Sequence, residues 1–306
     1  MSKHVAVLMG GWSAEREVSL VTGADVVKAL DERGYVVSTI DADHDIAATL
    51  SALDPRPDVV FNALHGRWGE DGNVQGVMNI LGLPYTHSGL LASAMAMDKV
   101  LAKRLFAAAG ITCPKGVVVD LESALAGRAM DPPFVVKPIS EGSSVGVHIV
   151  MDGDNYLGLH REAWQFGDEV LVERFIPGRE LTVAVMGGRS LAVTELQPHE
   201  GFYDYEAKYT DGKTTHLCPA PLPETVSSQA KDAALAAHEA LGCRGVSRAD
   251  FRYDDTEGDP GKLYLLEINT QPGLTPLSLV PEQAAHVGID FGALVSWMVE
   301  DARCDT

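Results

Sequence analysis

Positively charged residues are scarce in this chain. Its 306 residues include 24 lysines and arginines against 43 aspartates and glutamates, which gives a net charge of −19 at pH 7. So acidic a protein is repelled by nucleic-acid phosphates and by anionic lipid headgroups, and the composition therefore argues against nucleic-acid and membrane partners. Any anionic ligand would have to be bound by a few well-placed cations.

Cysteines and long apolar runs are also scarce. The four cysteines form no C-x-x-C pair and no cluster with the ten histidines, a pattern typical of reduced packing residues and not of a disulfide framework or a zinc site. No apolar run approaches the ~18–20 residues that span a bilayer. The chain passes from MSKH directly into an apolar strand, without the pattern of a signal peptide. We therefore expect a cytoplasmic protein.

Apolar residues are plentiful and follow regular patterns. They make up 46% of the chain, against 22% charged residues, and this composition and length predict two or three globular domains. In residues 1–93, Leu20, Ala24 and Val27 have the spacing of a helix face. Apolar runs typical of strands buried on both faces of a parallel sheet occupy 4–11, 35–42 and 58–66. Residues 1–93 therefore predict an open α/β domain.

The pattern changes after residue 93, where strands begin to dominate. A helix comes first, and its expected buried face is Met97, Leu101, Leu105 and Ala108. The strands expected next lie at 132–138, 145–150, 169–175 and 179–186. In the last of them, Leu181, Val183 and Val185 alternate with Glu180, Thr182 and Ala184, as in a half-buried antiparallel strand. We expect an α+β domain over 94–180 and another over 181–306, with helices at 226–241 and 282–301.

Two further strands, expected at 246–253 and 263–269, bring carboxylates together. Alternation places Arg248 and Asp250 on one face of the first strand, and Glu267 and Asn269 on one face of the second. If the strands pair as a hairpin, Asp250 can lie opposite Glu267, and their oxygens suit a hard cation such as Mg²⁺. The alternative is a structural ion pair in which Arg248 alone neutralises the carboxylates.

The segment EGSSVG, at 141–146, joins two of the expected strands. Small residues in such a turn can place backbone N–H groups over phosphate oxygens, although an ordinary hairpin loop has the same composition. The segment also contains G-x-S-x-G around Ser144, the pattern of a hydrolase nucleophile. That pattern requires a helix after the serine, whereas Val145, Val147 and Ile149 favour a strand.

Several single positions allow both a structural and a functional interpretation. Lys137 lies within the apolar run FVVKPI, where a buried ammonium needs an anion. Lys99, opposite the apolar face of its helix, is typical of a solvent-exposed lysine. Glu15 near a helix start complements the helix dipole or binds a ligand at the end of a parallel sheet, and His65 follows a strand in the same way. The aromatic-rich segment 201–216 is typical of a lid or of a structural surface loop.

Seven segments occur in one order along the chain: GGWSAEREVSL, NALHGRWGEDG, MDK, VVKPISEGSSVGV, FYDYEAKY, SRADF and LEINTQPGLTPLSLVP. Together they resemble the D-alanine–D-alanine ligases of the ATP-grasp superfamily. The resemblance implies an N-terminal α/β domain followed by an ATP-grasp fold, in which two α+β subdomains clamp the nucleotide.

The resemblance also implies a two-step ligation for peptidoglycan precursor synthesis. The carboxylate of one D-alanine takes the γ-phosphate of ATP, and the amine of a second D-alanine attacks the acyl phosphate. Phosphorylation is needed because a carboxylate oxygen is a poor leaving group. Besides ATP and D-alanine, the resemblance implies two Mg²⁺ or Mn²⁺ ions, which neutralise charge on the transferring phosphate, and a homodimer.

Residue roles follow from the resemblance position by position. The catalytic set is Glu15, Ser143, Tyr209 and Arg248, of which Arg248 stabilises the oxyanion of the tetrahedral intermediate. The ATP contacts are Lys99, Lys137, Ser144, Glu173, Arg174, Ile176, Glu180 and Lys208. The D-alanine contacts are Glu15, His65, Arg248, Gly273, Ser278 and Leu279. The metal ligands are Asp250, Glu267 and Asn269.

Three positions qualify the resemblance. Arg174 stands where lysine is usual, and Gln271 is an uncommon residue within the run N-T-x-P-G. Tyr209 matches the tyrosine that accompanies dipeptide formation, whereas relatives that make D-alanyl-D-lactate have phenylalanine there. The alternatives are another ATP-grasp carboxylate–amine ligase, such as a D-alanine–D-lactate ligase, a serine hydrolase that uses Ser144, and a non-catalytic nucleotide-binding module.

Overall fold

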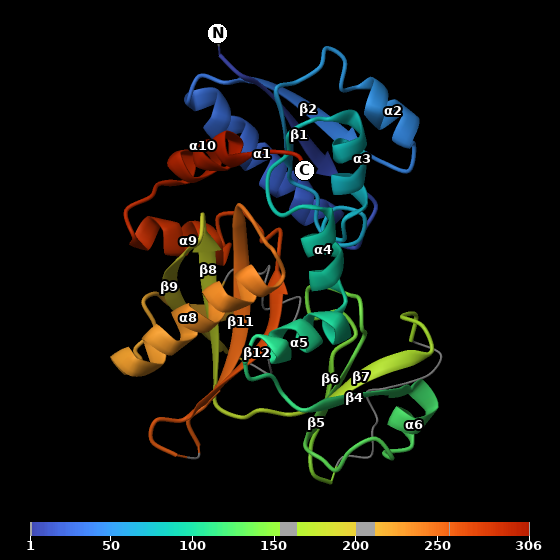
Figure 1. Ribbon diagram of the computed structural model, residues 1–306, viewed down its shortest axis with the longest axis vertical. Coiled ribbons are helices and arrows are strands. Elements are labelled where there is room, and N and C mark those ends of the chain that lie inside the picture. Colours follow the sequence, from blue (N-terminus) through green and yellow to red (C-terminus); the bar gives the residue numbers. More distant parts are fainter. Residues whose placement is uncertain (1, 154–163, 200–211, 257, 306) are drawn as a thin grey trace.

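A computed structural model describes residues 2–153, 164–199, 212–256 and 258–305. The strands of this part of the chain form three sheets, and the N-terminal sheet lies at the top of Figure 1 above the other two. The N-terminal sheet is parallel with the order β2-β1-β3. Its elements are β1 (His4–Gly10), α1 (Arg16–Glu32), β2 (Val36–Ala42), α2 (Ile46–Ser51), β3 (Val59–Asn62) and α3 (Asn73–Leu81).

Burial in the N-terminal sheet is less even than the sequence predicts. Val5, Val7 and Phe61 of β1 and β3 are fully buried, as expected for strands covered on both faces. The prediction is wrong for β2, an edge strand in which Val36 is 55% exposed. The other edge of the sheet is covered, because Val60 of β3 forms a bridge with Tyr85.

Helix α1 is present as predicted, but it buries a different face. Ala24, expected to be buried, is exposed, whereas Ser19 and Thr22 are fully buried. These polar residues are tolerated inside because they form hydrogen bonds. Ser19 Oγ donates to the carbonyl of Ala63 at 2.8 Å, and Thr22 Oγ1 lies 3.0 Å from His65 Nε2. The buried face of α1 therefore supports the C-terminal end of β3.

The second sheet is antiparallel with the order β4-β7-β5-β6. It comprises β4 (Gly116–Asp120), β5 (Phe134–Lys137), β6 (His148–Val150) and β7 (Glu169–Arg174), and helix α6 (Leu121–Leu125) covers it. Phe134 and Val136 form its core with Leu121 of α6. The sequence missed β4, which lies at the edge and has no fully buried residue to mark its pattern.

Two helices connect the first two sheets, α4 (Leu90–Met97) and α5 (Lys99–Ala108). The Asp98 carboxylate begins α5 by accepting hydrogen bonds from the N–H groups of Val100 and Leu101. The predicted buried face is wrong, because Leu101 is 38% exposed while Phe106 is fully buried. The break at Asp98 rotates α5 relative to the expected continuous helix.

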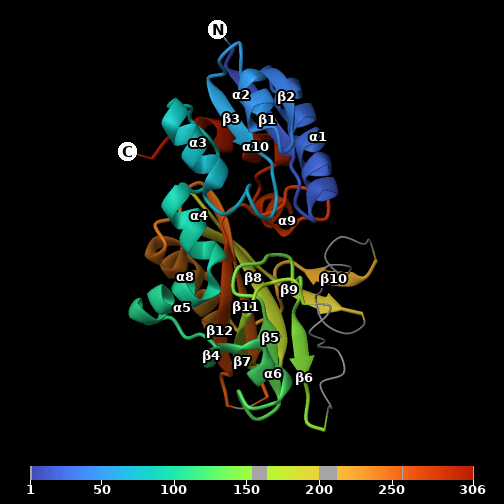
Figure 2. The same cartoon turned by 90° about the vertical axis from the view of Figure 1, so that its right-hand side faces the viewer.

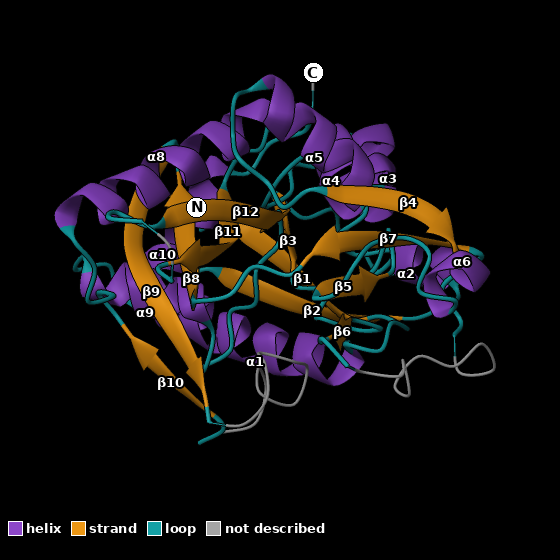
Figure 3. Cartoon of the chain, turned by 90° about the horizontal axis from the view of Figure 1, so that it is seen from below, coloured by secondary structure: helices purple, strands orange, loops and turns teal. Residues whose placement is uncertain are grey.

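The third and largest sheet is antiparallel with the order β10-β9-β8-β11-β12. Its strands are β8 (Arg179–Met186), β9 (Arg189–Pro198), β10 (Thr214–Leu217), β11 (Val246–Asp254) and β12 (Lys262–Asn269). Strands β9 and β10 were not predicted. Figure 3 shows this sheet beside the second sheet, with α8 (Glu224–Ala240) and α9 (Leu279–His286) on opposite sides of its strands.

Strand β8 is buried on both faces, contrary to the predicted half-buried pattern. Val183 and Val185 pack in one cluster with Ala230 of α8. Ala184 and Met186 pack in another cluster that includes α9 and the N-terminal sheet. A sequence pattern cannot show that both faces of a central strand are covered, because small Ala184 resembles a surface residue.

The expected helix at 282–301 is two helices, α9 and α10 (Phe291–Asp301). Gly288, with a φ of +84°, separates the two helices. The Asp290 carboxylate caps the start of α10 by accepting a hydrogen bond from the N–H of Ala293 at 2.7 Å. In Figures 1 and 2, α10 lies beside α1. Leu294 and Met298 of α10 join the core of the N-terminal sheet, so the C-terminal end of the chain buttresses its N-terminal end.

Two composition-based expectations can also be compared with the structure. All four cysteines are free, as predicted: Cys113, Cys218, Cys243 and Cys304. Within the described ranges, none of the helices is both long enough and apolar enough to cross a membrane.

Candidate active site

Two cavities of different size meet between the three sheets. The large cavity, of about 640 Å³, lies between the two antiparallel sheets, and the small cavity, of about 80 Å³, reaches the N-terminal sheet. Lys99, Glu141 and Glu267 line both. Ligands bound in the two cavities would therefore meet beside these three residues.

Most of the predicted site residues line one of the two cavities. The small cavity is lined by Glu15, His65, Lys99, Ser143, Arg248, Glu267, Asn269, Gly273, Ser278 and Leu279. The large cavity is lined by Lys99, Lys137, Ser144, Glu173, Arg174, Ile176, Glu180 and Glu267. Asp250 accepts hydrogen bonds from Arg248 and lines neither cavity. Lys208, Tyr209 and most of the expected lid at 201–216 lie outside the described residues.

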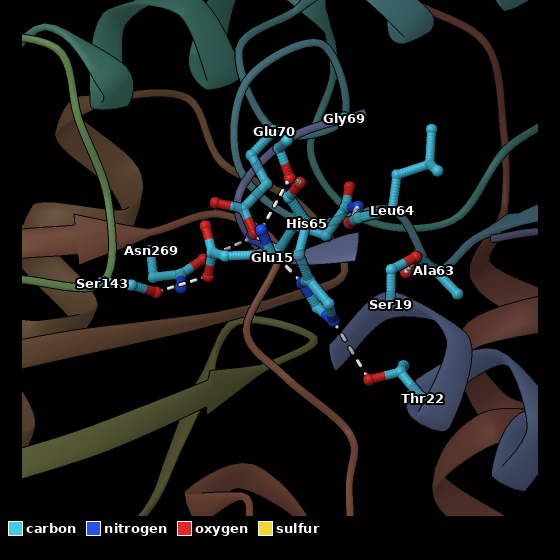
Figure 4. Close-up of polar contacts among 12 residues, drawn as sticks. Glu15, Ser19, Thr22, Ala63, Leu64, His65, Gly69, Glu70, Ser143 and Asn269 are labelled. Carbon is cyan, nitrogen blue, oxygen red and sulfur yellow. Dashed lines mark hydrogen bonds and ion pairs between the residues drawn. The ribbon is translucent and has the colours of Figure 1, made fainter. Parts of the chain in front are cut away.

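A hydrogen bond between Glu15 and Ser143 joins the start of α1 to the loop 141–146. Glu15 immediately precedes α1, and it is 7% exposed. Ser143 Oγ donates to the Glu15 carboxylate, and Figure 4 shows the two side chains pointing toward each other. A longer contact, 3.7 Å between Arg67 Nη1 and Glu141 Oε1, also joins the N-terminal part of the chain to this loop. The small cavity thus has a carboxylate and a hydroxyl on this wall.

His65 is held on both ring nitrogens. Nε2 lies 3.0 Å from Thr22 Oγ1 and Nδ1 lies 3.1 Å from Glu70 Oε1 (Figure 4). Burial raises the pKa of Glu70, and its contact with His65 opposes that shift. Glu70 was not predicted from the sequence, although it lies five residues after His65 and lines the same cavity.

The C-terminal wall of the small cavity confirms the predicted hairpin. In the antiparallel pairing of β11 with β12, Asp250 lies opposite Glu267 and Arg248 opposite Asn269. Arg248 Nε and Nη2 donate to the two oxygens of Asp250 at 2.8 and 2.7 Å. Thr182 Oγ1 donates to the same carboxylate at 2.8 Å. Arg248 is thus paired with Asp250 within the predicted register, but it does not neutralise both carboxylates alone, because Lys99 Nζ lies 3.5 Å from Glu267 Oε2.

The donor set at this hairpin fits a magnesium ion in chemical type. Asp250, Glu267 and Asn269 supply carboxylate and carboxamide oxygens, the ligands that Mg²⁺ prefers. No group of three or more His, Cys, Asp or Glu residues able to hold a metal occurs in the described parts of the chain.

Lys99 is buried where the two cavities join, contrary to its expected exposure. It is 8% exposed, its Nζ lies 3.5 Å from Glu267 Oε2, and it donates to the carbonyl of Glu141. Burial lowers the pKa of Lys99, and the charge of Glu267 partly offsets the shift. The same rotation of α5 that exposes Leu101 turns Lys99 inward.

Lys137 has the buried anion that the sequence predicts for it. Its Nζ lies 2.5 Å from Glu173 Oε2, and Lys103 Nζ lies 2.9 Å from Glu173 Oε1. Burial raises the pKa of Glu173, but the charges of the two lysines outweigh burial and leave that pKa below its usual value. Lys103 was missed, although its spacing of four from Lys99 places both on one helix face.

The loop 141–146 is a turn that leads into a strand. Ser143 and Ser144 have φ angles of +50° and +58°, values rare for residues with a side chain. Strand β6 follows, so the helix that a hydrolase nucleophile requires after Ser144 is missing, as the sequence predicts. Ser143 faces the small cavity and Ser144 the large one, which fits a loop that contacts ligands in both.

The remaining wall of the small cavity comes from the segment after β12. Thr275 N–H donates to Ser278 Oγ at 2.9 Å, which closes a turn just before α9 begins at Leu279. A Cβ at position 273 would come 2.9 Å from Ser278 Oγ, so Gly273 allows this turn to close tightly. The backbone of Gly273 thereby approaches the cavity.

Two antiparallel sheets that enclose a nucleotide-sized cavity, beside an N-terminal parallel sheet, are the architecture of the ATP-grasp class of proteins. The family described as "D-ala D-ala ligase C-terminus" matches residues 118–300, and "D-ala D-ala ligase N-terminus" matches residues 46–88. The chain belongs to the D-alanine–D-alanine ligase family.

Individual relatives agree over the full length. The chain is 58% identical over 306 residues to a D-alanine–D-alanine ligase of Parvibaculum lavamentivorans, covering 99% of each chain. It is 59% identical over 308 residues to one of Paramagnetospirillum magneticum, covering 100% of each. Among solved structures, the Bacillus anthracis D-alanine–D-alanine ligase complexed with ATP is 32% identical with a TM-score of 0.81, covering 98% of this chain and 97% of that one. The VanG D-Ala:D-Ser ligase of Enterococcus faecalis is 28% identical with a TM-score of 0.80, covering 98% and 99%.

Proposed function

We propose that this protein ligates two D-alanines to D-alanyl-D-alanine with conversion of ATP to ADP, for peptidoglycan precursor synthesis. The observation that carries the proposal is the junction of the two cavities at Lys99 and Glu267. The large cavity has room for a nucleotide, and the small cavity has room for little more than amino acids. Phosphoryl transfer from ATP to a carboxylate requires such a junction.

In the first step, the residues of the small cavity orient a D-alanine carboxylate toward the γ-phosphate. Glu15 binds the ammonium of this D-alanine, and Ser143 fixes the Glu15 carboxylate. Lys99 balances charge on the phosphate at the junction, since it is the buried cation there. Bringing the reacting groups together in one orientation accounts for much of the rate enhancement in such reactions.

The nucleotide lies in the large cavity. Lys137 and Ser144 contact its phosphates, the segment from Glu173 to Ile176 lines the adenine edge, and Glu180 binds the ribose. Arg252 Nη1 lies 3.4 Å from Glu180 Oε2, which fixes that carboxylate. Asp250, Glu267 and Asn269 would hold two Mg²⁺ or Mn²⁺ ions, which would neutralise charge on the transferring phosphate.

In the second step, the amine of a second D-alanine attacks the carbonyl carbon of the acyl phosphate. Arg248 stabilises the resulting oxyanion. His65, Ser278, Leu279 and the backbone at Gly273 surround the two substrates. Phosphate then leaves and the peptide bond forms, with no covalent attachment to the protein. Lys208 contacts the transferring phosphate, and Tyr209 acts together with Glu15 and Ser143.

The proposal is tested by ADP release in the presence of ATP and Mg²⁺. We expect release with D-alanine and formation of the dipeptide, but no release with L-alanine. Release with L-alanine alone would refute the substrate, and mixed assays with D-lactate or D-serine identify a different second substrate. Labelling of Ser144 by a fluorophosphonate probe would instead support a hydrolase.

We further propose a cytoplasmic homodimer with domains at 1–93, 94–180 and 181–306. The three sheets support these boundaries, since each lies within one range to within two residues. Ile80 and Leu91, on α3 and α4, support a subunit interface because they are 87% and 65% exposed. Light scattering on the unmodified protein and on Leu91→Glu tests the dimer, which the substitution should dissociate.

A further inference from the structure

Gln271 is a buried residue that lies between two parts of the candidate site. It follows Asn269, at the end of β12, by two residues and precedes Gly273 by two. Its side chain is 1% exposed. A buried carboxamide needs partners for both its oxygen and its nitrogen, so its contacts show which parts of the chain it connects.

The carboxamide of Gln271 is bonded at both ends to the segment around β3. Its Oε1 accepts a hydrogen bond from Asn62 Nδ2 at 2.8 Å, and its Nε2 donates to the carbonyl of Leu64. Its backbone N–H donates to Asn269 Oδ1 at 2.8 Å. Gln271 thus ties the end of β3 to the end of β12, although the two strands belong to different sheets.

On the β3 side, the contacts of Gln271 hold the backbone next to His65 and, through Asn62, the backbone next to Glu70. Leu64 immediately precedes His65. Asn62 Nδ2 also donates to the carbonyl of Gly69 at 3.0 Å, and Gly69 immediately precedes Glu70. Figure 4 shows Leu64 and Gly69 beside the His65–Glu70 pair, which lines the small cavity. Any shift of Gln271 would therefore move this wall of the cavity.

A second buried glutamine serves as a comparison. Gln283 is fully buried, and its carboxamide accepts from the N–H of Ala184 at 2.7 Å and donates to the carbonyl of Thr182 at 3.3 Å. It joins α9 to β8 and lines neither cavity. Gln271 differs because residues of the small cavity lie on both sides of its contacts, with Asn269 on one side and His65 on the other.

We propose that Gln271 is a positioning residue that sets the distance between the His65 wall of the small cavity and the Asn269 end of β12, and thereby the affinity for D-alanine and for the metal. This inference rests on the proposed function. Reacting groups must be held to within about 0.5 Å for efficient catalysis. The base end of the large cavity is built from β5 and β7, so the contacts of the adenine base do not depend on Gln271.

The test compares Gln271→Met, which keeps the volume and removes both side-chain hydrogen bonds, with the matched control Gln283→Met. For Gln271→Met we expect the KM for D-alanine and the half-saturating Mg²⁺ concentration to rise about tenfold or more, with the KM for ATP changed less than twofold when it is measured at saturating Mg²⁺. For Gln283→Met we expect a lower melting temperature and a D-alanine KM within twofold of the unmodified protein.

A Gln271→Met protein with a lower melting temperature and an unchanged D-alanine KM would overturn the proposal, because Gln271 would then serve stability alone. If this variant does not fold, Gln271→Ser, which leaves space for a water, and Asn62→Ser, which removes the partner, carry the same test.

If the unmodified protein releases no ADP with D-alanine, the proposed function fails by itself. Binding of Mn²⁺ with ATP, followed by electron paramagnetic resonance, then still shows whether Gln271→Ser weakens the metal site at least tenfold, as positioning requires, or leaves it unchanged.

Discussion

Lys99 Nζ lies 3.5 Å from Glu267 Oε2 where the small and large cavities meet. Lys99 comes from the first turn of α5 and Glu267 from β12, so the pair exists only when the helix packs on the end of the third sheet. In the proposed reaction, a phosphate is transferred from the large cavity to a carboxylate in the small one beside this pair. Lys99 would contact phosphate oxygens, and Glu267 would contact the metal.

Replacing Lys99 by methionine should lower kcat/KM for ATP-dependent ADP release by about 10²-fold or more, because a buried cation that stabilises developing charge is lost. Steady-state kinetics measures the effect. Lys115→Met, at an exposed position, is the control and should retain full activity. A loss of less than threefold in Lys99→Met would remove Lys99 from the site.

Asp250→Asn should raise the half-saturating Mg²⁺ concentration by about 10–100-fold, since it weakens both a metal ligand and the orientation of Arg248. The measurement is a Mg²⁺ titration of ADP release. Asp31→Asn, at an exposed position of α1, should leave the titration unchanged. An unshifted titration for Asp250→Asn would mean that Asp250 serves only its ion pair with Arg248.

Lys103→Met should destabilise the fold by about 1–3 kcal/mol, because it removes one of two cations that neutralise the buried Glu173 carboxylate. Urea unfolding measures the change. Combining it with Glu173→Gln should cost less than the sum of the single substitutions, since no buried anion is left without its partner. Additive costs would show that Lys103 and Glu173 do not interact.

Two buried histidines should make the fold sensitive to acid. Burial lowers the pKa of His87 to about 3 and that of His238 to about 4, from 6.5 in the unfolded chain. The unfolded state binds more protons below pH 6.5, so the stability that is fully present above this pH is lost as the pH falls toward 4. Between pH 7 and 5 each histidine should contribute a loss of about 2 kcal/mol.

Urea unfolding at several pH values checks this acid sensitivity. His238→Gln keeps a polar partner for Ser247, whose Oγ lies 2.7 Å from His238 Nδ1. This substitution should reduce the number of protons taken up on unfolding by about one, and so lower the slope of the unfolding free energy against pH. His286→Gln, at an exposed position, should change it much less. Equal slopes for all three proteins would show that His238 is not buried in its neutral form.

Tyr209→Phe should shift the second substrate from D-alanine toward D-lactate at low pH. Tyr209 belongs to the proposed set with Glu15 and Ser143, and removing its hydroxyl should weaken discrimination against a hydroxyl nucleophile. Product analysis in D-alanine and D-lactate mixtures at pH 6 and 8 measures the ratio. An unchanged ratio would mean that another residue selects the nucleophile.

The hairpin of β11 and β12 shows how far local patterns reach. Strand alternation over two neighbouring segments was enough to predict that Asp250 lies opposite Glu267, and the structure has that register. The orientation of Lys99 was not predictable in the same way. Its helix was expected to continue from residue 94, and only the break at Asp98 and the packing of Phe106 against the third sheet's core turn the lysine inward.

The sequence by itself determined the ligase family, the chemical types of the site residues and the strand register at the proposed metal site, because motifs and alternation are local properties of the chain. Only the tertiary structure decided which side chains meet across sheets. The Lys103–Glu173 pair, the His65–Glu70 contact and the link through Gln271 depend on packing. So does the junction of the cavities at Lys99, because burial and the pairing of distant charges follow from how sheets and helices cover one another.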